Sequence, residues 1–171
     1  SSARARGAEV LGVLLGVGEK ADDFHRTRSK PDGSPIIATI RAGLADAGLT
    51  PADIGYVNAH GTSTPENDRM EAFGLTAVFE DLAPRIPVSS NKSMIGHTLT
   101  AAGAIEAVFS ILTMRNGTLP PTINHDQPDP AIALDLVPNT ARSADVATVL
   151  SNSFGFGGQN VSLVLGREPR G

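Results

Sequence analysis

Three short and mostly apolar segments of the chain occupy residues 9–18, 56–59 and 86–90. The first of them reads EVLGVLLGVG and is bounded by glycines. Apolar runs of this length, without alternation, are typical of strands that are buried on both faces of a sheet. We therefore predict buried strands at residues 9–18 and 56–59 and a further short strand at residues 86–90.

Three longer segments have the features of helices. Residues 36–48 place apolar side chains at helical spacing and end at Gly48, a natural C-terminal cap. Residues 66–80 have one apolar side. Residues 99–114 are apolar almost all round, which predicts a helix that is buried on every side.

The remaining segments predict loops and two late strands. Residues 19–35 are charged and end in PDGSP, and residues 120–131 begin with two prolines that fit neither a helix nor a central strand. Residues 147–150 and 161–165 are apolar and predict strands with a glycine-rich turn between them. The alternation of strands and helices predicts an α/β layered fold with a mostly parallel sheet.

Composition limits the function classes. The 171 residues carry a net charge of −4 and are 40% hydrophobic, which suits one domain or one half of a larger pseudo-symmetric fold. No basic excess points to nucleic acid, and no apolar run is long enough to span a membrane. We therefore expect a cytoplasmic protein. The chain has no cysteine, so it holds no disulfide and no cysteine nucleophile.

The first candidate site is residues 58–65, NAHGTSTP, which follow a predicted strand and precede a predicted helix. Ligand-binding loops of α/β sheets occupy this position. His60 lies here beside the hydroxyls of Thr62, Ser63 and Thr64. A helix N-cap with one structural histidine nearby explains the same residues equally well.

The second candidate site is residues 89–97, SSNKSMIGH, with a loop at residues 91–96 ahead of the most apolar helix. Lys92 and His97 lie so close to a predicted buried helix that they need polar partners. Glu106 within that helix is a candidate partner, and a solvated glutamate is the alternative. The segment has neither a phosphate-binding P-loop nor a metalloprotease HExxH motif.

The third candidate site is residues 151–160, SNSFGFGGQN, in which glycines surround Phe154 and Phe156. A plain hairpin turn is one explanation, but two exposed aromatic side chains are unusual in such a turn. We favour a mobile gate over an apolar channel. The other two histidines, His25 and His125, lie in polar loops and are expected to have no role.

The motifs NAHGTST, NKSMIGH, GAIEA, LPPTIN and SNSFGFGGQN together resemble the β-ketoacyl-acyl-carrier-protein synthases of the thiolase superfamily. The resemblance covers nearly the whole chain. It implies that residues 1–171 are the C-terminal half of a thiolase-like αβαβα layered fold with a mixed sheet. In this family the nucleophilic cysteine lies in the N-terminal half, so the resemblance implies a chain that is competent only with that half.

The resemblance implies an acyltransferase, a 3-oxoacyl-[acyl-carrier-protein] synthase of fatty acid or polyketide elongation. Its reaction is a decarboxylative Claisen condensation of malonyl carrier protein with an acyl thioester. His60 and His97 correspond to the two histidines that donate hydrogen bonds to the thioester oxygen as negative charge develops. Lys92 corresponds to the family's active-site lysine, and Glu106 to a buried glutamate behind the site.

Other residues correspond to the substrate channel of the family. Thr62 and Thr64 correspond to hydroxyls that hold the phosphopantetheine arm of the carrier protein. Phe156 corresponds to the gating phenylalanine and Phe154 to its neighbour. No cofactor is implied beyond that arm, but some members hold a structural monovalent cation at the positions of Asn58, Glu106, Ser151 and Asn152.

The implied partners are an acyl carrier protein, the N-terminal half and, in the complete synthase, a second copy in a homodimer. One alternative is a non-catalytic subunit, like the chain-length factors of polyketide synthases, that binds carrier protein or acyl chain. His60, His97 and Lys92 count against it, because a structural partner does not need them. A thiolase-like enzyme that uses coenzyme A fits less well, since its resemblance would not include NKSMIGH and SNSFGFGG together.

Overall fold

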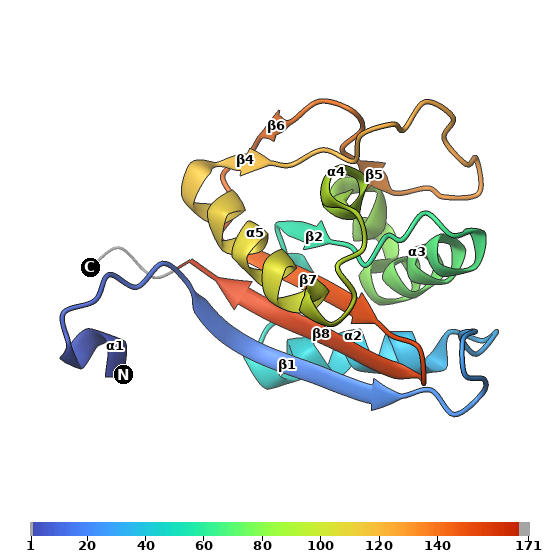
Figure 1. Cartoon of the computed structure of the whole chain (residues 1–171), viewed down its shortest axis with the longest axis horizontal. Helices are drawn as coiled ribbons and strands as arrows, with labels where there is room; N and C mark the ends of the chain where they lie inside the picture. The colour runs from blue at the N-terminus through green and yellow to red at the C-terminus, as the bar shows by residue number, and fades with distance from the viewer. Residues whose placement is uncertain (1, 168–171) are drawn as a thin grey trace.

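The computed structural model of the chain describes residues 2–167, and its centre is a six-stranded sheet with the strand order β1-β8-β7-β2-β3-β5 (Figure 1). The strands of this sheet are β1 (Val13–Ala21), β2 (Tyr56–Asn58), β3 (Pro87–Ser89), β5 (Asp135–Leu136), β7 (Thr148–Phe154) and β8 (Gln159–Gly166). A second sheet pairs β4 (Thr118–Leu119) with β6 (Arg142–Ser143).

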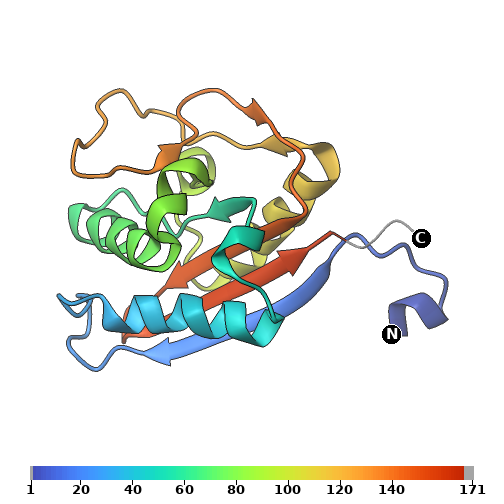
Figure 2. The same ribbon diagram turned by 180° about the vertical axis from the view of Figure 1, so that it is seen from behind.

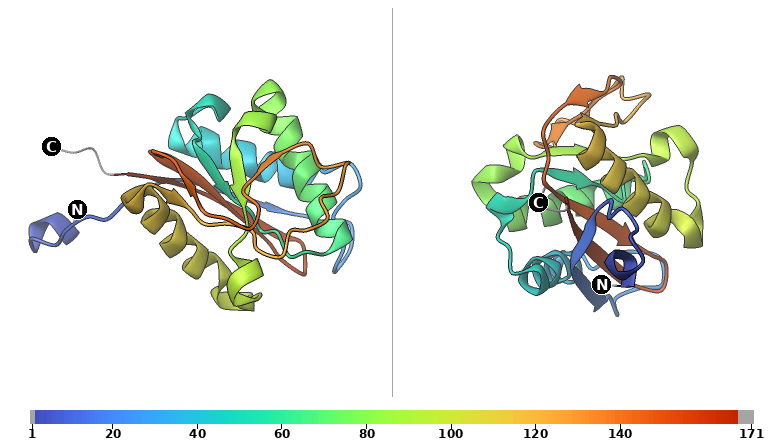
Figure 3. Two further views of the ribbon diagram at one scale, coloured as in Figure 1. Left: turned by 90° about the horizontal axis from the view of Figure 1, so that it is seen from above. Right: turned by 90° about the vertical axis from the view of Figure 1, so that its left-hand side faces the viewer.

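Helices cover both faces of the large sheet. The α-helices are α1 (Ser2–Ala5), α2 (Ser34–Ala47), α3 (Pro65–Phe79), α4 (Lys92–Ile95) and α5 (Ala102–Asn116), with 3-10 turns η1 (Pro51–Asp53), η2 (Glu80–Arg85) and η3 (Leu99–Ala101). Helices α2 and α3 lie on one face and α5 on the other (Figures 2 and 3). The chain therefore has α, β and α layers, and the α/β class is confirmed.

Each face of the sheet has its own apolar core. The core under α2 and α3 is the larger and includes Ile36, Ile40, Leu44, Leu75, Val78, Phe79, Val88 and Leu150. The core under α5 includes Tyr56, Met114, Leu119, Val137, Val149 and Leu165. Strand β7 supplies Leu150 to one core and Val149 to the other, since successive side chains of a strand point to opposite faces.

Helix α2 forms where the apolar spacing predicts it, and Ile40 and Leu44 are buried on one side. Gly48 ends the helix with a φ of 66° and donates its N–H to the last carbonyls, so the predicted cap is confirmed. The helix packs directly on the backbone of β1. A Cβ atom at Gly18 would lie 2.0 Å from the carbonyl oxygen of Thr39, so only glycine fits there.

The sheet is mixed, and three of its five strand pairs are parallel, so the predicted mostly parallel sheet is confirmed. Strands β7, β2, β3 and β5 run parallel, whereas β8 is antiparallel to both β7 and β1. Only residues 155–158 connect β7 to β8, and parallel neighbours need a crossover of about a dozen residues or more. The short glycine turn therefore forces the antiparallel pair, and the mixed sheet implied by the resemblance is confirmed.

Strand β1 differs from its prediction in position and in burial. It begins at Val13 rather than at residue 9 and continues past Gly18 into charged residues. It pairs only with β8, so it is an edge strand, and Leu15 and Val17 are 38% and 41% exposed. Burial on both faces was the wrong expectation, because α2 covers one face and the other is largely uncovered within residues 2–167.

Helix α5 is not buried on every side, which corrects the prediction. Its buried positions are Ala102, Glu106, Ser110, Thr113 and Met114. Val108 and Leu112 are 56% and 43% exposed, and Leu99 just before the helix is 70% exposed. Both polar and apolar residues of the helix therefore face its own sheet, and further apolar residues face outward. Apolar composition indicates that these side chains avoid water, but it does not tell which segment covers them.

Several short elements lie outside the sequence prediction. Helix α4 occupies most of the predicted loop at residues 91–96. Strand β4 lies just before the paired prolines at residues 120–121, and β5 and β6 lie after them. Such elements depend on backbone hydrogen bonds without a long apolar pattern. Within residues 2–167, no helix combines the length and the apolar character needed to cross a lipid bilayer.

Candidate active site

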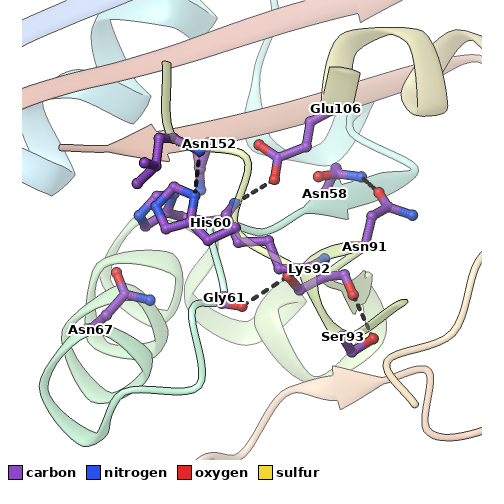
Figure 4. Close-up of polar contacts among 12 residues, drawn as sticks. Asn58, His60, Gly61, Asn67, Asn91, Lys92, Ser93, Glu106 and Asn152 are labelled. Atoms are coloured by element: carbon purple, nitrogen blue, oxygen red, sulfur yellow. Dashed lines mark hydrogen bonds and ion pairs between the residues drawn. The ribbon is translucent and has the colours of Figure 1, made fainter. Parts of the chain in front are cut away.

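The first two candidate segments meet at the carboxyl ends of the parallel strands. Strand β7, in which the third segment begins, ends beside them. Strands β2, β3 and β7 are parallel neighbours with β2 in the middle, so their carboxyl ends lie side by side. His60 follows β2, Lys92 follows β3, and Phe154 ends β7. Figure 4 shows the side chains of His60, Lys92 and Glu106 grouped at this edge. Ligand sites of open α/β sheets form in this place.

A buried carboxylate, which the sequence analysis did not select, holds the loop of His60. The backbone N–H groups of His60 and Gly61 donate to the two carboxylate oxygens of Glu71, each at 2.9 Å. Asn152 Nδ2 donates to Glu71 Oε1 at 3.1 Å. Burial raises the pKa of Glu71, and the N–H donors oppose that rise. The backbone of the loop is therefore fixed from helix α3 and strand β7, which leaves the imidazole free for chemistry.

The rings of His60 and His97 lie edge to face with their centroids 5.4 Å apart. Burial and the positive charge of Lys92, together with His97, lower the pKa of His60 to about 3. His97 is exposed in this chain. The loss of some of its hydration and the charge of Lys92 nevertheless lower its pKa. Both imidazoles are therefore neutral at pH 7, and each offers one N–H donor and one acceptor nitrogen.

A hydrogen bond from the backbone determines which ring nitrogen of His97 carries the hydrogen. The N–H of Leu99 donates to Nδ1 of His97 at 3.1 Å, so Nδ1 is the acceptor of the neutral ring. The hydrogen of the neutral ring then lies on Nε2. His97 is thus prepared as a hydrogen-bond donor without protonation.

Lys92 and Glu106 form a buried ion pair across α4 and α5. Their side chains are 5% and 2% exposed, so the predicted pairing is confirmed and the solvated glutamate is wrong. Burial raises the pKa of Glu106, and the bond from Lys92 opposes the rise. The pair holds a positive charge near both histidines, where it favours their neutral forms.

Thr62 and Thr64 lie between β2 and α3 with their hydroxyl oxygens 2.9 Å apart. Thr64 occupies the N-cap position of α3, but its side chain makes no capping hydrogen bond. Thr64 therefore lies where the N-cap alternative puts it, but its hydroxyl does not cap the helix. Both hydroxyls remain at the accessible side of the loop, since Thr62 is half-buried and Thr64 is exposed.

The two phenylalanines of the third segment differ in environment. Phe154 is 9% exposed, and its ring centroid lies 5.8 Å from that of His60. Phe156 in the turn after β7 is 81% exposed. The expectation of two exposed aromatic residues is wrong for Phe154, because β7 continues to that residue and alternation turns its side chain inward. The segment is a hairpin turn in shape, and its role as a gate stays a prediction.

Two buried oxygens bear on the cation positions implied by the resemblance. Asn58 Oδ1 and Glu106 Oε2 are buried and have no hydrogen-bond partner within residues 2–167. Asn152, in contrast, uses its amide to donate to Glu71 and to accept from a serine hydroxyl. In the described part of the chain, no three residues of the types His, Cys, Asp and Glu are grouped to hold a metal. Unpaired oxygens are donors of the kind that a hard cation prefers, and the four implied cation positions stay a prediction.

A cavity of about 420 Å³ opens beside the histidine loops. His97, Lys92 and Gly61 form its wall on the side of the site. The other walls come from α3, β3 and residues 122–136, and His125 lies at that end. His125 is half-buried and lines this cavity, so it is closer to the site than the sequence analysis expected, whereas His25 is exposed.

Glu71 is the functional residue that the sequence analysis missed, and the sequence does contain a signal for it. Glu71, Leu75 and Val78 are spaced by four and three residues, so they share one side of helix α3. All three are buried. A carboxylate within an apolar stripe is costly unless it is bonded, which marks it as a polar partner of a neighbouring loop.

The fold and this pair of neutral histidines define the class of thiolase-like ketosynthases. The family described as "Beta-ketoacyl synthase, C-terminal domain" matches residues 11–126. The 3-oxoacyl-[acyl-carrier-protein] synthase 2 of Coxiella burnetii is 47% identical over 165 residues, which is 96% of this chain and 40% of that protein. The chain belongs to the β-ketoacyl synthase family, as its C-terminal domain.

Solved structures support the same assignment. The ishigamide ketosynthase/chain length factor is similar with a TM-score of 0.92 and 42% identity, over 98% of this chain and 41% of that chain. A type II polyketide synthase acyl-carrier protein in complex with its ketosynthase gives a TM-score of 0.93 and 37% identity, over 96% and 40%. The chain thus spans about two fifths of the length of the relatives that it matches.

Proposed function

We propose that this chain is part of a 3-oxoacyl-[acyl-carrier-protein] synthase and supplies the decarboxylation half of its active site. The observation that carries this proposal is the pair of neutral imidazoles, 5.4 Å apart, beside a lysine that is fixed by a buried ion pair. Neutral donors are suited to an oxygen that gains negative charge only during the reaction, because they stabilise the transition state more than the ground state.

In the proposed reaction, an acyl group is held as a thioester on a cysteine of the N-terminal part of the synthase. The malonyl thioester oxygen accepts hydrogen bonds from His60 and His97. The bond between the malonyl carboxylate and its carbon breaks, carbon dioxide leaves, and the electron pair passes into the enolate. The carbon of the enolate then attacks the acyl carbonyl, and the cysteine leaves as a thiolate. Lys92 stays in its ion pair and stabilises the charge throughout.

The substrate arm belongs to the accessible side of the His60 loop in this proposal. The phosphopantetheine of an acyl carrier protein lies along Thr62 and Thr64, whose paired hydroxyls are within reach of solvent. Phe156 is the movable side chain at the entrance, and Phe154 is a wall of the site beside His60. The relative that was solved with its acyl-carrier protein supports a partner of this kind.

The apolar outer side of α5 supports a partner segment that this chain does not include. Leu99, Val108 and Leu112 are each more than 40% exposed, and Leu15 and Val17 of β1 add to the same kind of surface. The matched relatives are more than twice as long as this chain. We assign the N-terminal part of the synthase, which carries the cysteine, to this surface. A homodimer of the complete synthase and a cytoplasmic location stay predictions.

A structural monovalent cation is part of the proposal. Asn58 and Glu106 would hold it through their unpaired oxygens, with Ser151 and the backbone near Asn152 as further ligands. When bound, such an ion would add positive charge beside Glu106, while Lys92 keeps its ion pair with the same carboxylate. No other cofactor is required, because the substrate arm carries the reacting thioester.

The proposal is tested by the release of carbon dioxide from malonyl carrier protein by the complete synthase. His60→Ala and His97→Ala are each expected to lower kcat by about two to three orders of magnitude, which is typical for the loss of one such donor. His25→Ala, an exposed histidine of a loop, is the matched control and keeps the wild-type rate. Unchanged rates in both test variants would contradict the assigned roles. Carrier-protein binding without any carbon dioxide release would favour the non-catalytic alternative.

A further inference from the structure

Ser90 lies between the two loops that carry the candidate catalytic residues, and every polar atom that it owns is hydrogen-bonded. Its hydroxyl donates to the carbonyl oxygen of Gly61 at 2.8 Å. The same hydroxyl oxygen accepts the N–H of Lys92 at 3.3 Å. The residue is 6% exposed, so water does not replace these bonds.

The backbone of Ser90 is anchored on its other side. Its N–H donates to Thr122 Oγ1 at 2.9 Å, and its carbonyl accepts the hydroxyl of Ser93 at 3.0 Å. Ser93 Oγ in turn accepts the N–H of Ile123 at 3.0 Å. The segment after the paired prolines therefore serves as an outer support, and it fixes the direction in which the Ser90 hydroxyl points.

The peptide at Gly61 is held from two directions. Its N–H is bonded to Glu71, and its carbonyl is bonded to Ser90. The two loops touch so closely that a Cβ atom on Gly61 would lie 2.5 Å from the Cβ atom of Ser90. With a φ of 41°, Gly61 also has a backbone conformation that favours glycine. The loop of His60 therefore packs directly against the loop of Lys92.

We propose that Ser90 is a positioning residue, which sets the distance between the His60 loop and the Lys92–His97 loop. This inference rests on the proposed function. Ser90 also lines the cavity, and in this proposal it acts through its bonds to Gly61 and Lys92. Without its hydroxyl, the Gly61 carbonyl and the Lys92 N–H are left without their partner, and the loops separate. A misplacement of about 1 Å between catalytic groups can cost about a hundredfold in rate.

The main test is Ser90→Ala in the complete synthase. The kcat for carbon dioxide release is expected to fall by about ten- to a hundredfold while KM stays within about threefold, because the lost interaction positions groups for the transition state. A crystal structure of the variant is expected to show that the separation of the His60 and His97 ring centroids departs from 5.4 Å. Unchanged kcat together with an unchanged ring separation overturns the proposal.

Matched variants separate positioning from a general loss of packing. Ser110→Ala removes a fully buried hydroxyl that is bonded only to Glu106 O of its own helix, so it is expected to keep kcat near the wild-type value. Thr122→Val removes the support of Ser90 without touching either loop, and it lowers kcat by less than Ser90→Ala does. Thr122→Ser keeps the acceptor oxygen and restores the rate. A kcat loss in Ser110→Ala equal to that in Ser90→Ala would also overturn the proposal.

The two proposals fail in different ways. If the wild-type protein releases no carbon dioxide, the proposed function fails, but the ring separation in the crystal structures still tests Ser90. If Ser90→Ala does not fold, the contrast between Thr122→Val and Thr122→Ser decides. Equal rates and equal ring separations in those two variants count against Ser90 as a positioning residue.

Discussion

Helices α2 and α5 cover opposite faces of one sheet, and they bury opposite kinds of residue. Helix α2 turns Ile36, Ile40 and Leu44 toward its sheet. Helix α5 turns Glu106, Ser110 and Thr113 inward, and its outer side includes Val108 and Leu112. Helix α2 therefore serves the stability of this chain. In the proposed function, Glu106 on the inner side of α5 serves the site, and the outer side of α5 serves a neighbouring part of the synthase.

The largest expected effect is on the polar inner side of α5. Glu106→Ala leaves the ammonium of Lys92 buried without its partner and is expected to lower the free energy of unfolding by about 3–5 kcal/mol. Denaturant unfolding of the protein measures this loss. The double variant Lys92→Met/Glu106→Leu removes both charges and should recover most of it. A loss in Glu106→Ala below about 1 kcal/mol would show that the pair is not a buried one.

A comparable but smaller loss is expected on α2. Ile40 is fully buried, so Ile40→Ala removes apolar contacts and leaves a cavity at a cost of about 3 kcal/mol. Ile37→Ala on the same helix is the control, since Ile37 is only partly buried and should cost less. Equal losses at the two positions would contradict the one-sided packing of α2.

Acid is expected to act on the candidate site and not on α2, because His60 is buried at the site and α2 contains no histidine. The pKa of His60 is about 3 in the folded protein and about 6.5 in the unfolded chain. Below pH 6.5 the unfolded chain takes up a proton that the folded protein does not, so stability falls as pH decreases toward 3. The slope from this group is at most about 1.4 kcal/mol per pH unit.

Stability curves of the wild type and of His60→Gln between pH 4 and 6 test that expectation. Glu71 and Glu106, whose raised pKa values act in the opposite direction, are present in both proteins and cancel in the difference. The variant should lose less stability on acidification than the wild type. Parallel curves would show that His60 titrates normally.

The smallest effect is expected on the outer side of α5. Leu112→Ser and Val108→Ser replace side chains that are already exposed to solvent, so each should change the free energy of unfolding of this chain by no more than about 0.5 kcal/mol. The same unfolding measurement as for Ile40→Ala applies. If Leu112→Ser were as costly as Ile40→Ala, the outer side would be packed within this chain and the contrast between the helices would disappear.

Elements with a long regular pattern could be predicted from the sequence. The apolar spacing of residues 36–48 and the terminal Gly48 predicted α2, and the three strand-to-loop segments were selected as candidate sites. What failed depends on tertiary context. The burial of β1 and α5 is decided by which segment covers them, and the apolar character of Leu15 or Val108 is the same with or without a cover.

The site residues show the same limit. The pairing of Lys92 with Glu106 could be predicted, because two charges near one buried helix need each other. The inward turn of Phe154 depended on how far β7 extends, and the glycines after it suggested an earlier end. Ser90 and Glu71 act by bonding backbone groups of another loop, and such bonds leave no motif in the sequence. Only for Glu71 does the sequence give a signal, because it lies in the apolar stripe of α3.

The pairing of β1 with β8 has a consequence for how the protein is made. Val13 lies opposite Gly166 and Ala21 opposite Gln159, so the first strand of this sheet along the chain pairs with the last. A ribosome adds roughly 5–20 residues per second, so β8 emerges on the order of ten seconds after β1. Helix α2 can dock on the glycines of β1 early, because that contact is local. The first strand of the sheet to be synthesised is therefore the last to gain its hydrogen-bonded neighbour, and its backbone stays open to other chains until then.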